Sequence, residues 1–248
     1  MNGKVFGLLI IAVIISFVGG FLLANALNRS ELNTLRTDNE QLKNAPVAPN
    51  QNPSVSSLSD EEIRRRIDEA DGNPNNIEFQ KNLGLALYRY AAMKQDADLL
   101  AEVGRVLTRA YDNNKQDYDV VVALGNIYFD IGYFKKDNAP FQKAREFYSQ
   151  ALQQKPNDVD VRTDLGLTYF LINPPENERA VAEFQKSLQT NPKHEKTLQV
   201  ITQTFLAQNN AAEAEKYVTK LREVNSENQY LAELESRLSQ IKVNLPKQ

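Results

Sequence analysis

The pattern of hydrophobic and polar positions changes sharply along the 248 residues of this chain. Residues 5–24 are almost wholly apolar, and no charged residue stands between Lys4 and Arg29. About 20 apolar residues, each rising ~1.5 Å in a helix, cross the ~30 Å hydrocarbon core of a bilayer. The pattern therefore predicts a transmembrane anchor over residues 1–28, followed by a polar and mostly helical region.

A cleaved secretory signal peptide is the alternative interpretation of the same residues. Ala24-Asn25-Ala26 fits the pattern of a cleavage site, but the apolar run is longer than the ~7–15 residues of a typical signal peptide. Both interpretations carry the bulk of the chain across the membrane. We expect a single-pass protein of the inner (plasma) membrane, with a cytoplasmic N-terminus and the remainder in the periplasm or otherwise outside the cytoplasm.

Two patterns near the N-terminus indicate self-association. Small residues recur at every fourth position of the apolar run: Ala12, Ser16, Gly20 and Ala24. This spacing places them on one ridge of a helix, where two backbones can approach closely in lipid. Residues 29–44 then fit a heptad pattern with a and d positions at Leu32, Leu35, Asn39 and Leu42. Because an Asn at one a position fixes the register of parallel dimers, we expect a short coiled-coil stalk and a parallel homodimer. A short solvated helix is the alternative.

Residues 45–58 separate this stalk from the rest of the chain. They contain three prolines and no charged residue, a composition typical of a disordered linker. Ser59 and Glu62 then form a capping-box pattern, which predicts that a helix begins there. We expect one domain over residues 59–248.

A repeating pattern follows from residue 75 onward. Its first motif is an aliphatic residue and a glycine, with a large apolar residue three positions later: Leu83-Gly84…Leu87, Leu124-Gly125…Tyr128 and Leu165-Gly166…Tyr169, with Ile201-Thr202…Phe205 as a variant. A second triad at spacings of four and three follows each one: Val103-Leu107-Ala110, Ala144-Tyr148-Ala151, Ala180-Phe184-Ser187 and Ala214-Val218-Leu221.

This pattern resembles the tetratricopeptide repeat (TPR) and covers about 150 residues in four repeats. The resemblance implies an all-α, right-handed TPR helical solenoid of about four repeats plus capping helices, in which the glycines let paired helices approach closely. These glycines are 41 residues apart, whereas the usual unit has 34. We therefore expect about seven extra residues in each of the first two connections between helices, with residues 134–138 forming the second loop.

Both ends of the repeat region have the pattern of capping helices. Ile63, Ile67 and Ala70 repeat the spacing of the second triad, so residues 59–71 are interpreted as half a repeat. Residues 227–242 place four apolar residues on one face of a polar helix: Leu231, Leu234, Leu238 and Ile241. Such a helix covers the last hydrophobic face of a solenoid.

The resemblance also implies a groove lined by the first helix of each pair. Counted from the aliphatic–Gly pair, its positions are Lys81, Leu85, Tyr88, Val122, Asn126, Phe129, Thr163, Leu167 and Phe170, with Gln199, Gln203 and Leu206 in the fourth repeat. TPR proteins that bind a C-terminal carboxylate use Lys and Asn residues at several such positions, where Leu85, Thr163 and Leu167 stand here. We therefore expect a largely apolar trough that suits an amphipathic helix or an extended hydrophobic segment.

Composition and charge exclude several classes of function. The formal net charge is −3 and there is no basic stripe, so we expect no nucleic-acid partner. The chain has no cysteine and one histidine, His194, which we interpret as a surface loop residue. No phosphate-binding loop or nucleophile motif occurs. We expect no enzyme activity, no catalytic residues, no metal site and no cofactor.

These features together predict a membrane-anchored TPR scaffold or adaptor for protein–protein interactions in the bacterial envelope, with a role in chaperone-related or assembly-related peptide binding. One alternative is a structural, self-associating subunit of an envelope complex. Another is the TPR subunit of cytochrome c maturation, a family that commonly has an additional membrane span. These assignments rest on analogy at the level of the fold.

Overall fold

The computed structural model describes residues 59–244 of the chain. Within this part the chain forms ten α-helices and no strand. The predicted anchor (1–28), stalk (29–44) and linker (45–58) lie outside the described residues, and so do the residues predicted to mediate dimerisation. None of the helices between residues 59 and 244 combines the length and apolar character that crossing a bilayer requires.

The chain divides into two compact units, the first ending at Ala110 and the second beginning at Tyr111. The first contains α3 (Asp60–Gly72), α4 (Ile77–Lys94) and most of α5 (Ala97–Asn113). The second contains α6 (Tyr118–Lys135), α7 (Asn138–Gln154), α8 (Val159–Leu171), α9 (Asn177–Thr190), α10 (Glu195–Ala207), α11 (Ala211–Val224) and α12 (Leu231–Asn244). We call these unit 1 and unit 2.

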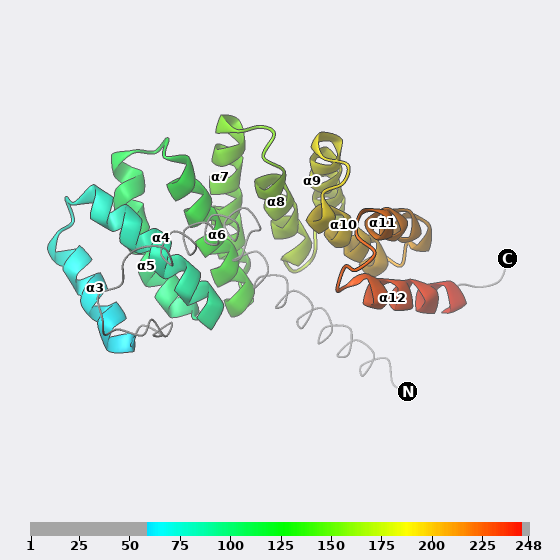
Figure 1. The fold of residues 1–248 in the computed structure, drawn as a ribbon, viewed down its shortest axis with the longest axis horizontal. Coiled ribbons are helices and arrows are strands. Elements are labelled where there is room, and N and C mark those ends of the chain that lie inside the picture. The colour runs from blue at the N-terminus through cyan, green and yellow to red at the C-terminus, as the bar shows by residue number, and fades with distance from the viewer. Residues whose placement is uncertain (1–58, 245–248) are drawn as a thin grey trace, which may run out of the picture. The chain divides into compact units, whose positions relative to one another are not determined.

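Consecutive helices of unit 2 form the predicted pairs (Figure 1). Helix α6 packs on α7, α8 on α9, and α10 on α11. The first helices of the pairs also adjoin one another, because α8 contacts both α6 and α10. The last helix, α12, packs on α11 and α10. This succession of helix pairs confirms the all-α repeat architecture predicted from the sequence.

Two of the repeated glycines allow their helix pairs to approach closely. A Cβ atom on Gly125 would lie 2.7 Å from Cε1 of Tyr148, and one on Gly166 would lie 2.5 Å from Cε1 of Phe184. Both aromatic side chains are fully buried. Because carbon atoms in proteins pack at about 3.5–4.0 Å, a side chain at either glycine would push the paired helix away.

The extra residues of the first two repeats lengthen the helices. Helices α4 and α6 have 18 residues, whereas α8 and α10 have 13. The prediction that residues 134–138 form a loop is wrong, because α6 continues to Lys135 and α7 begins at Asn138. Lys136 takes a left-handed conformation with φ 54°, and the N–H of Asp137 bonds to the carbonyl of Gly132. This C-terminal motif ends α6 within two residues.

The two terminal helices bury the faces that the sequence predicted. Helix α3 begins at the predicted cap, where the N–H of Glu62 donates to Oγ of Ser59, and it buries Ile63, Ile67 and Ala70. Helix α12 begins at Leu231 rather than at residue 227, after a turn. It buries its three leucines, while Ile241 is only half-buried.

Candidate functional site

The predicted groove residues of unit 1 lie on one face of α4. Lys81, Leu85 and Tyr88 are spaced by four and three positions, which places them one above another along the helix. All three are half-buried. This face of α4 thus combines a cationic, an aliphatic and an aromatic side chain, and its role in ligand binding stays a prediction.

The predicted groove residues of α6 are divided between the surface and the helix pair. Val122 is half-buried. Asn126 accepts a hydrogen bond of 2.8 Å from the hydroxyl of Tyr148 on α7, and Phe129 packs edge-on against Phe141 of the same helix, with ring centroids 5.5 Å apart. Asn126 and Phe129 thus have packing roles inside unit 2 that the sequence did not predict.

Thr163 of α8 lies inside a buried hydroxyl cluster. Its Oγ1 is 3.0 Å from Oγ of Ser187 on α9 and 2.6 Å from Oγ1 of Thr197 on α10. Leu167 and Phe170 are buried as well. The first helix of the next repeat, α10, adjoins α8. The neighbouring repeat can therefore cover positions that counting along the helix assigns to a groove. A direct role of these three residues in ligand binding stays a prediction.

Several polar pairs that the sequence analysis did not identify join the first helices of unit 2. Nζ of Lys196 on α10 lies 2.7 Å from Oδ1 of Asp164 on α8, and both side chains are largely buried. His194 is the residue that precedes α10, without a side-chain capping hydrogen bond, and its Nε2 lies 3.2 Å from Oδ1 of Asp160. The hydrogen bond from His194 lowers the pKa of Asp160. His194 thus lies in the loop between α9 and α10, as predicted, but it is half-buried there and contacts Asp160 rather than lying free on the surface.

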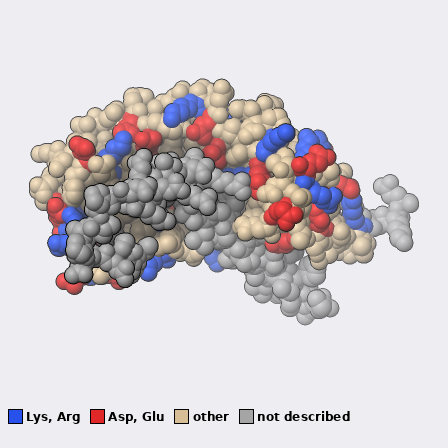
Figure 2. Space-filling view, in the orientation of Figure 1, with Lys and Arg blue, Asp and Glu red and all other residues tan. Residues whose placement is uncertain are grey.

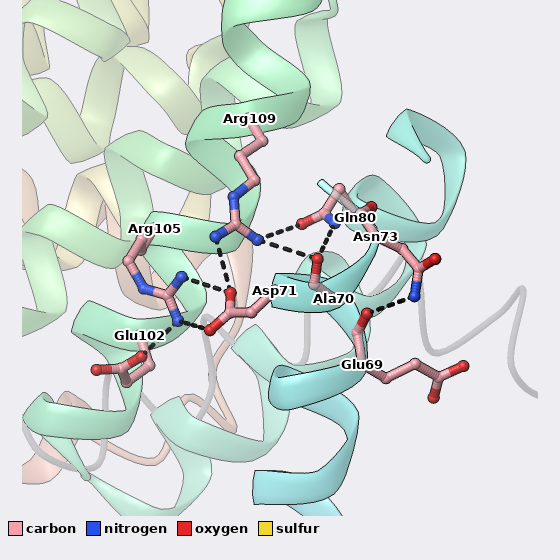
Figure 3. Close-up of polar contacts among 8 residues, drawn as sticks. All are labelled: Glu69, Ala70, Asp71, Asn73, Gln80, Glu102, Arg105 and Arg109. Atoms are coloured by element: carbon pink, nitrogen blue, oxygen red, sulfur yellow. Dashed lines mark hydrogen bonds and ion pairs between the residues drawn. The ribbon is translucent and has the colours of Figure 1, made fainter. Parts of the chain in front are cut away.

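A larger polar cluster fixes α3 within unit 1 (Figure 3). Arg105 donates to both carboxylate oxygens of Asp71, at 2.6 and 2.9 Å, and Arg109 donates to one of them at 2.7 Å. These two guanidinium groups lower the pKa of Asp71 to about 2. The fully buried Gln80 donates to the carbonyls of Ala70 and Asn73 and accepts from Arg109. The cluster satisfies the carbonyl groups at the C-terminal end of α3.

Unit 2, by contrast, contains buried polar side chains with atoms that lack a hydrogen-bond partner within the described residues. Every residue of α10 from Thr197 to Leu206 is buried. Among these, Nε2 of Gln199 and Nε2 of Gln203 have no hydrogen-bond partner in the described part of the chain, and neither has Oε1 of Glu233 on α12. Such groups are uncommon in folded proteins. The sequence placed Gln199 and Gln203 among the groove positions, but only the fold shows that they are buried, because a glutamine on a helix is ordinarily solvent-exposed.

Two other features of the described residues concern metal and small-molecule binding. No group of three or more His, Asp or Glu side chains between residues 59 and 244 is arranged to hold a metal ion. A cleft of about 240 Å³ between α9 and α11 lies below the ~300–1,000 Å³ of typical small-molecule sites. Figure 2 shows Lys, Arg, Asp and Glu interspersed on the visible described surface, without a broad patch of one sign.

A known protein resembles part of this chain in sequence. No family model matches the chain. Over 88 residues it is 30% identical to the transcription factor tau 131 kDa subunit of Saccharomyces cerevisiae, a stretch that covers 32% of this chain and 8% of that protein. The chain thus spans less than a tenth of that relative.

Solved structures resemble the chain over a greater length. MamA superposes with a TM-score of 0.53 at 22% identity, covering 67% of this chain and 88% of MamA. TTC0263, a thermophilic TPR protein of Thermus thermophilus, gives 0.52 at 14% identity, covering 73% of this chain and 97% of its own. A tetratricopeptide repeat protein of Parabacteroides merdae gives 0.50 at 20% identity, with 64% and 61% covered. The resemblance seen in the sequence is thereby confirmed: in its fold, this chain is a tetratricopeptide-repeat protein.

Proposed function

We propose that this protein is a scaffold that binds other polypeptides in the bacterial envelope and is anchored in the inner membrane by residues 1–28. The TPR fold supports the scaffold role, since its neighbours of known structure are TPR proteins. The uncharged apolar run of residues 5–24 supports the anchor. The binding domain then lies outside the cytoplasm, and no catalysis is involved.

The observation that carries the binding role is the adjacency of first helices in unit 2. Helices α6, α8 and α10 adjoin in succession, so side chains from three repeats are presented by one layer of helices. Val122 on α6 is half-buried in this layer. Stacked helices of this kind form extended surfaces for polypeptides.

Site-specific photo-crosslinking in the full chain tests this role. A photoreactive phenylalanine analogue at Val122 should crosslink a partner polypeptide in the cell envelope, and excess purified unlabelled domain should compete. The matched control is the same analogue at Ser149, an exposed position on α7. Equal crosslinking at both positions would show that the first helices are not the binding layer.

Fractionation and protease accessibility test the location. The full chain should remain with membranes after alkaline extraction, and protease added to spheroplasts should digest residues 59–248. A mature chain that starts at Leu27 would establish the signal-peptide alternative instead. Digestion only after lysis would place the domain in the cytoplasm and contradict the proposal.

A further inference from the structure

A cleft of about 240 Å³ lies between α9 and α11, the second helices of two successive pairs in unit 2. The layer that we propose for polypeptide binding consists instead of the first helices α6, α8 and α10. The lining of the cleft includes Gln185, Leu188 and Gln189 of α9, Leu198 of α10, and Tyr217 and Lys220 of α11. We call these six residues the α9–α11 cleft.

The inner part of the α9–α11 cleft is apolar. Leu198 is fully buried, Tyr217 is 5% exposed and Leu188 is half-buried. The ring of Tyr217 stacks on Phe205 of α10, with ring centroids 5.6 Å apart, and this contact fixes its position. The volume of the cleft is below the ~300–1,000 Å³ of small-molecule sites. The cleft therefore suits a single bulky apolar side chain, as do the pockets that hold the anchor residues of protein interfaces.

The rim of the α9–α11 cleft is formed by exposed polar side chains. Gln185, Gln189 and Lys220 make no side-chain hydrogen bond or ion pair with any residue in the part of the chain that the structure describes. Lys216, one turn earlier on α11, is by contrast paired with Glu213 at 3.4 Å. The rim therefore offers two amide groups and one ammonium group to a ligand.

The charge at the cleft favours a ligand with carboxylate groups. Among the described residues that line the cleft, Lys220 is the only charged one. Glu183 on α9 is already paired with Arg162 at 3.1 Å and with Lys186 at 2.6 Å. A carboxylate beside the apolar side chain of a ligand would therefore pair with Lys220. The two glutamine amides can donate to the main-chain carbonyls of the same ligand.

We infer that the α9–α11 cleft is a second docking site, which binds a short acidic segment of a partner protein. The segment inserts one bulky apolar side chain against Leu188, Leu198 and Tyr217, and it places a neighbouring carboxylate on Lys220. This inference goes beyond the proposed function, because the site is formed mainly by second helices rather than by the layer of first helices. With both surfaces occupied, the scaffold would hold two polypeptides at once.

Methyl NMR of the full-length protein in an uncharged detergent tests the site. The probe is the heptapeptide GSDLDSG, acetylated and amidated at its ends, in which two aspartates flank one leucine. Its addition should shift the methyl signals of Leu188 and Leu198, while the methyl signals of Val122 on α6 stay unchanged.

Two matched peptides separate the contributions of charge and apolar contact. GSNLNSG lacks the carboxylates and should bind about threefold to fivefold more weakly, as expected for the loss of an exposed ion pair. GSDADSG lacks the bulky apolar side chain and should bind about tenfold more weakly or less tightly still.

Replacing Lys220 tests the recognition of charge. In Lys220→Gln, the preference for GSDLDSG over GSNLNSG should disappear, and the melting temperature should stay constant because this side chain is exposed. Lys216→Gln is the matched control. Nζ of Lys216 and Nζ of Lys220 lie 5.3 and 5.6 Å from the ring centroid of Tyr217, but only Lys220 lines the cleft. The control should therefore keep the preference.

Several results would overturn the inference. One is the absence of methyl shifts at Leu188 and Leu198, and another is an unchanged preference between the peptides in Lys220→Gln. A third is weaker binding of the probe at higher protein concentration, which would assign the cleft to contacts between copies of this chain. The crosslinking experiment at Val122 tests the proposed function separately, so either idea can fail without the other.

Discussion

The two terminal helices have similar apolar faces but are fixed by different means. Helix α3 has 13 residues and α12 has 14, and each buries three apolar side chains. The end of α3 is also held by Asp71, Gln80, Arg105 and Arg109, whose hydrogen bonds satisfy one another (Figure 3). Helix α12 has exposed ion pairs on one side, and on the other side Glu233 has an unpaired carboxylate oxygen.

This difference shows that the apolar pattern of a capping helix does not decide how firmly it is held. A satisfied buried polar network specifies one arrangement, whereas a partly satisfied network weakens the arrangement it belongs to. We therefore expect α3 to be a permanent cap and α12 to open at lower free energy. Regions that open for a ligand are generally the less stable parts of a structure.

The largest expected effect comes from truncating one buried apolar side chain in each cap. Leu234 is fully buried and Ile63 is 3% exposed, so replacing either with Ala should cost about 2–5 kcal/mol. In Leu234→Ala, α12 should lose its amide protection in hydrogen exchange. In Ile63→Ala, α3 should stay protected, because its polar cluster remains. Equal loss of protection in the two helices would remove the contrast between the caps.

Substituting buried glutamines should give effects of opposite sign in the two units. Gln80→Met removes the amide that joins α3 to α5, and we expect a loss of about 1–3 kcal/mol. Gln203→Met removes an amide without a partner and should be neutral or stabilising. Thermal and urea denaturation of the two variants measure the difference. A destabilised Gln203→Met would mean that its amide has a structural partner.

Acid should loosen α3 through Asp71. The folded pKa of Asp71 is about 2, below the ordinary carboxyl value of about 3.9, so its ion pairs stabilise the fold fully above pH ~4. This contribution is lost as pH falls toward 2. The partly exposed site makes the effect smaller than the pKa alone suggests.

The helical circular dichroism signal, followed from pH 5 to 2, measures this loss. Asp71→Asn should lower the free energy of unfolding at neutral pH. The stability of the variant should then fall less between pH 5 and 2 than that of the original chain. If the variant and the original chain follow the same acid transition, protonation of Asp71 does not loosen α3.

The smallest effect is expected from the ion pair between α12 and α11. Because Arg222 and Glu235 are partly exposed, Glu235→Arg should cost no more than about 1 kcal/mol. A double-mutant cycle with Arg222→Glu isolates the interaction between the two side chains. A much larger coupling would mean that this pair, rather than the leucines, holds α12 in place.

The features that the sequence predicted well are local and periodic. The cap at Ser59, the spacing of Ile63 and Ile67, and the glycines at 125 and 166 each follow from the geometry of one helix or one helix pair. The loop predicted at residues 134–138 was wrong because a left-handed Lys136 ends α6 without a glycine. That conformation has no strong signature in a single sequence.

The candidate site was predicted less completely. Counting from the repeat motif placed Val122 and Asn126 on the correct helix, but the count could not show that Asn126 bonds to Tyr148. Nor could it show that Thr163 joins hydroxyl groups of α9 and α10. These contacts depend on how adjacent repeats pack, and a helix count does not contain that information.

The sequence by itself determined that this chain forms paired helices, that a helix begins after Ser59, and which residues of the repeat motifs form apolar faces, because these properties depend on residues three or four positions apart. Only the tertiary structure decided which polar groups are paired. Asp71 and Arg105 are 34 positions apart in sequence, and Gln199 and Glu233 lie on helices that meet only through packing. A polar group without a partner is costly only where it is buried, and burial is a property of the assembled repeats.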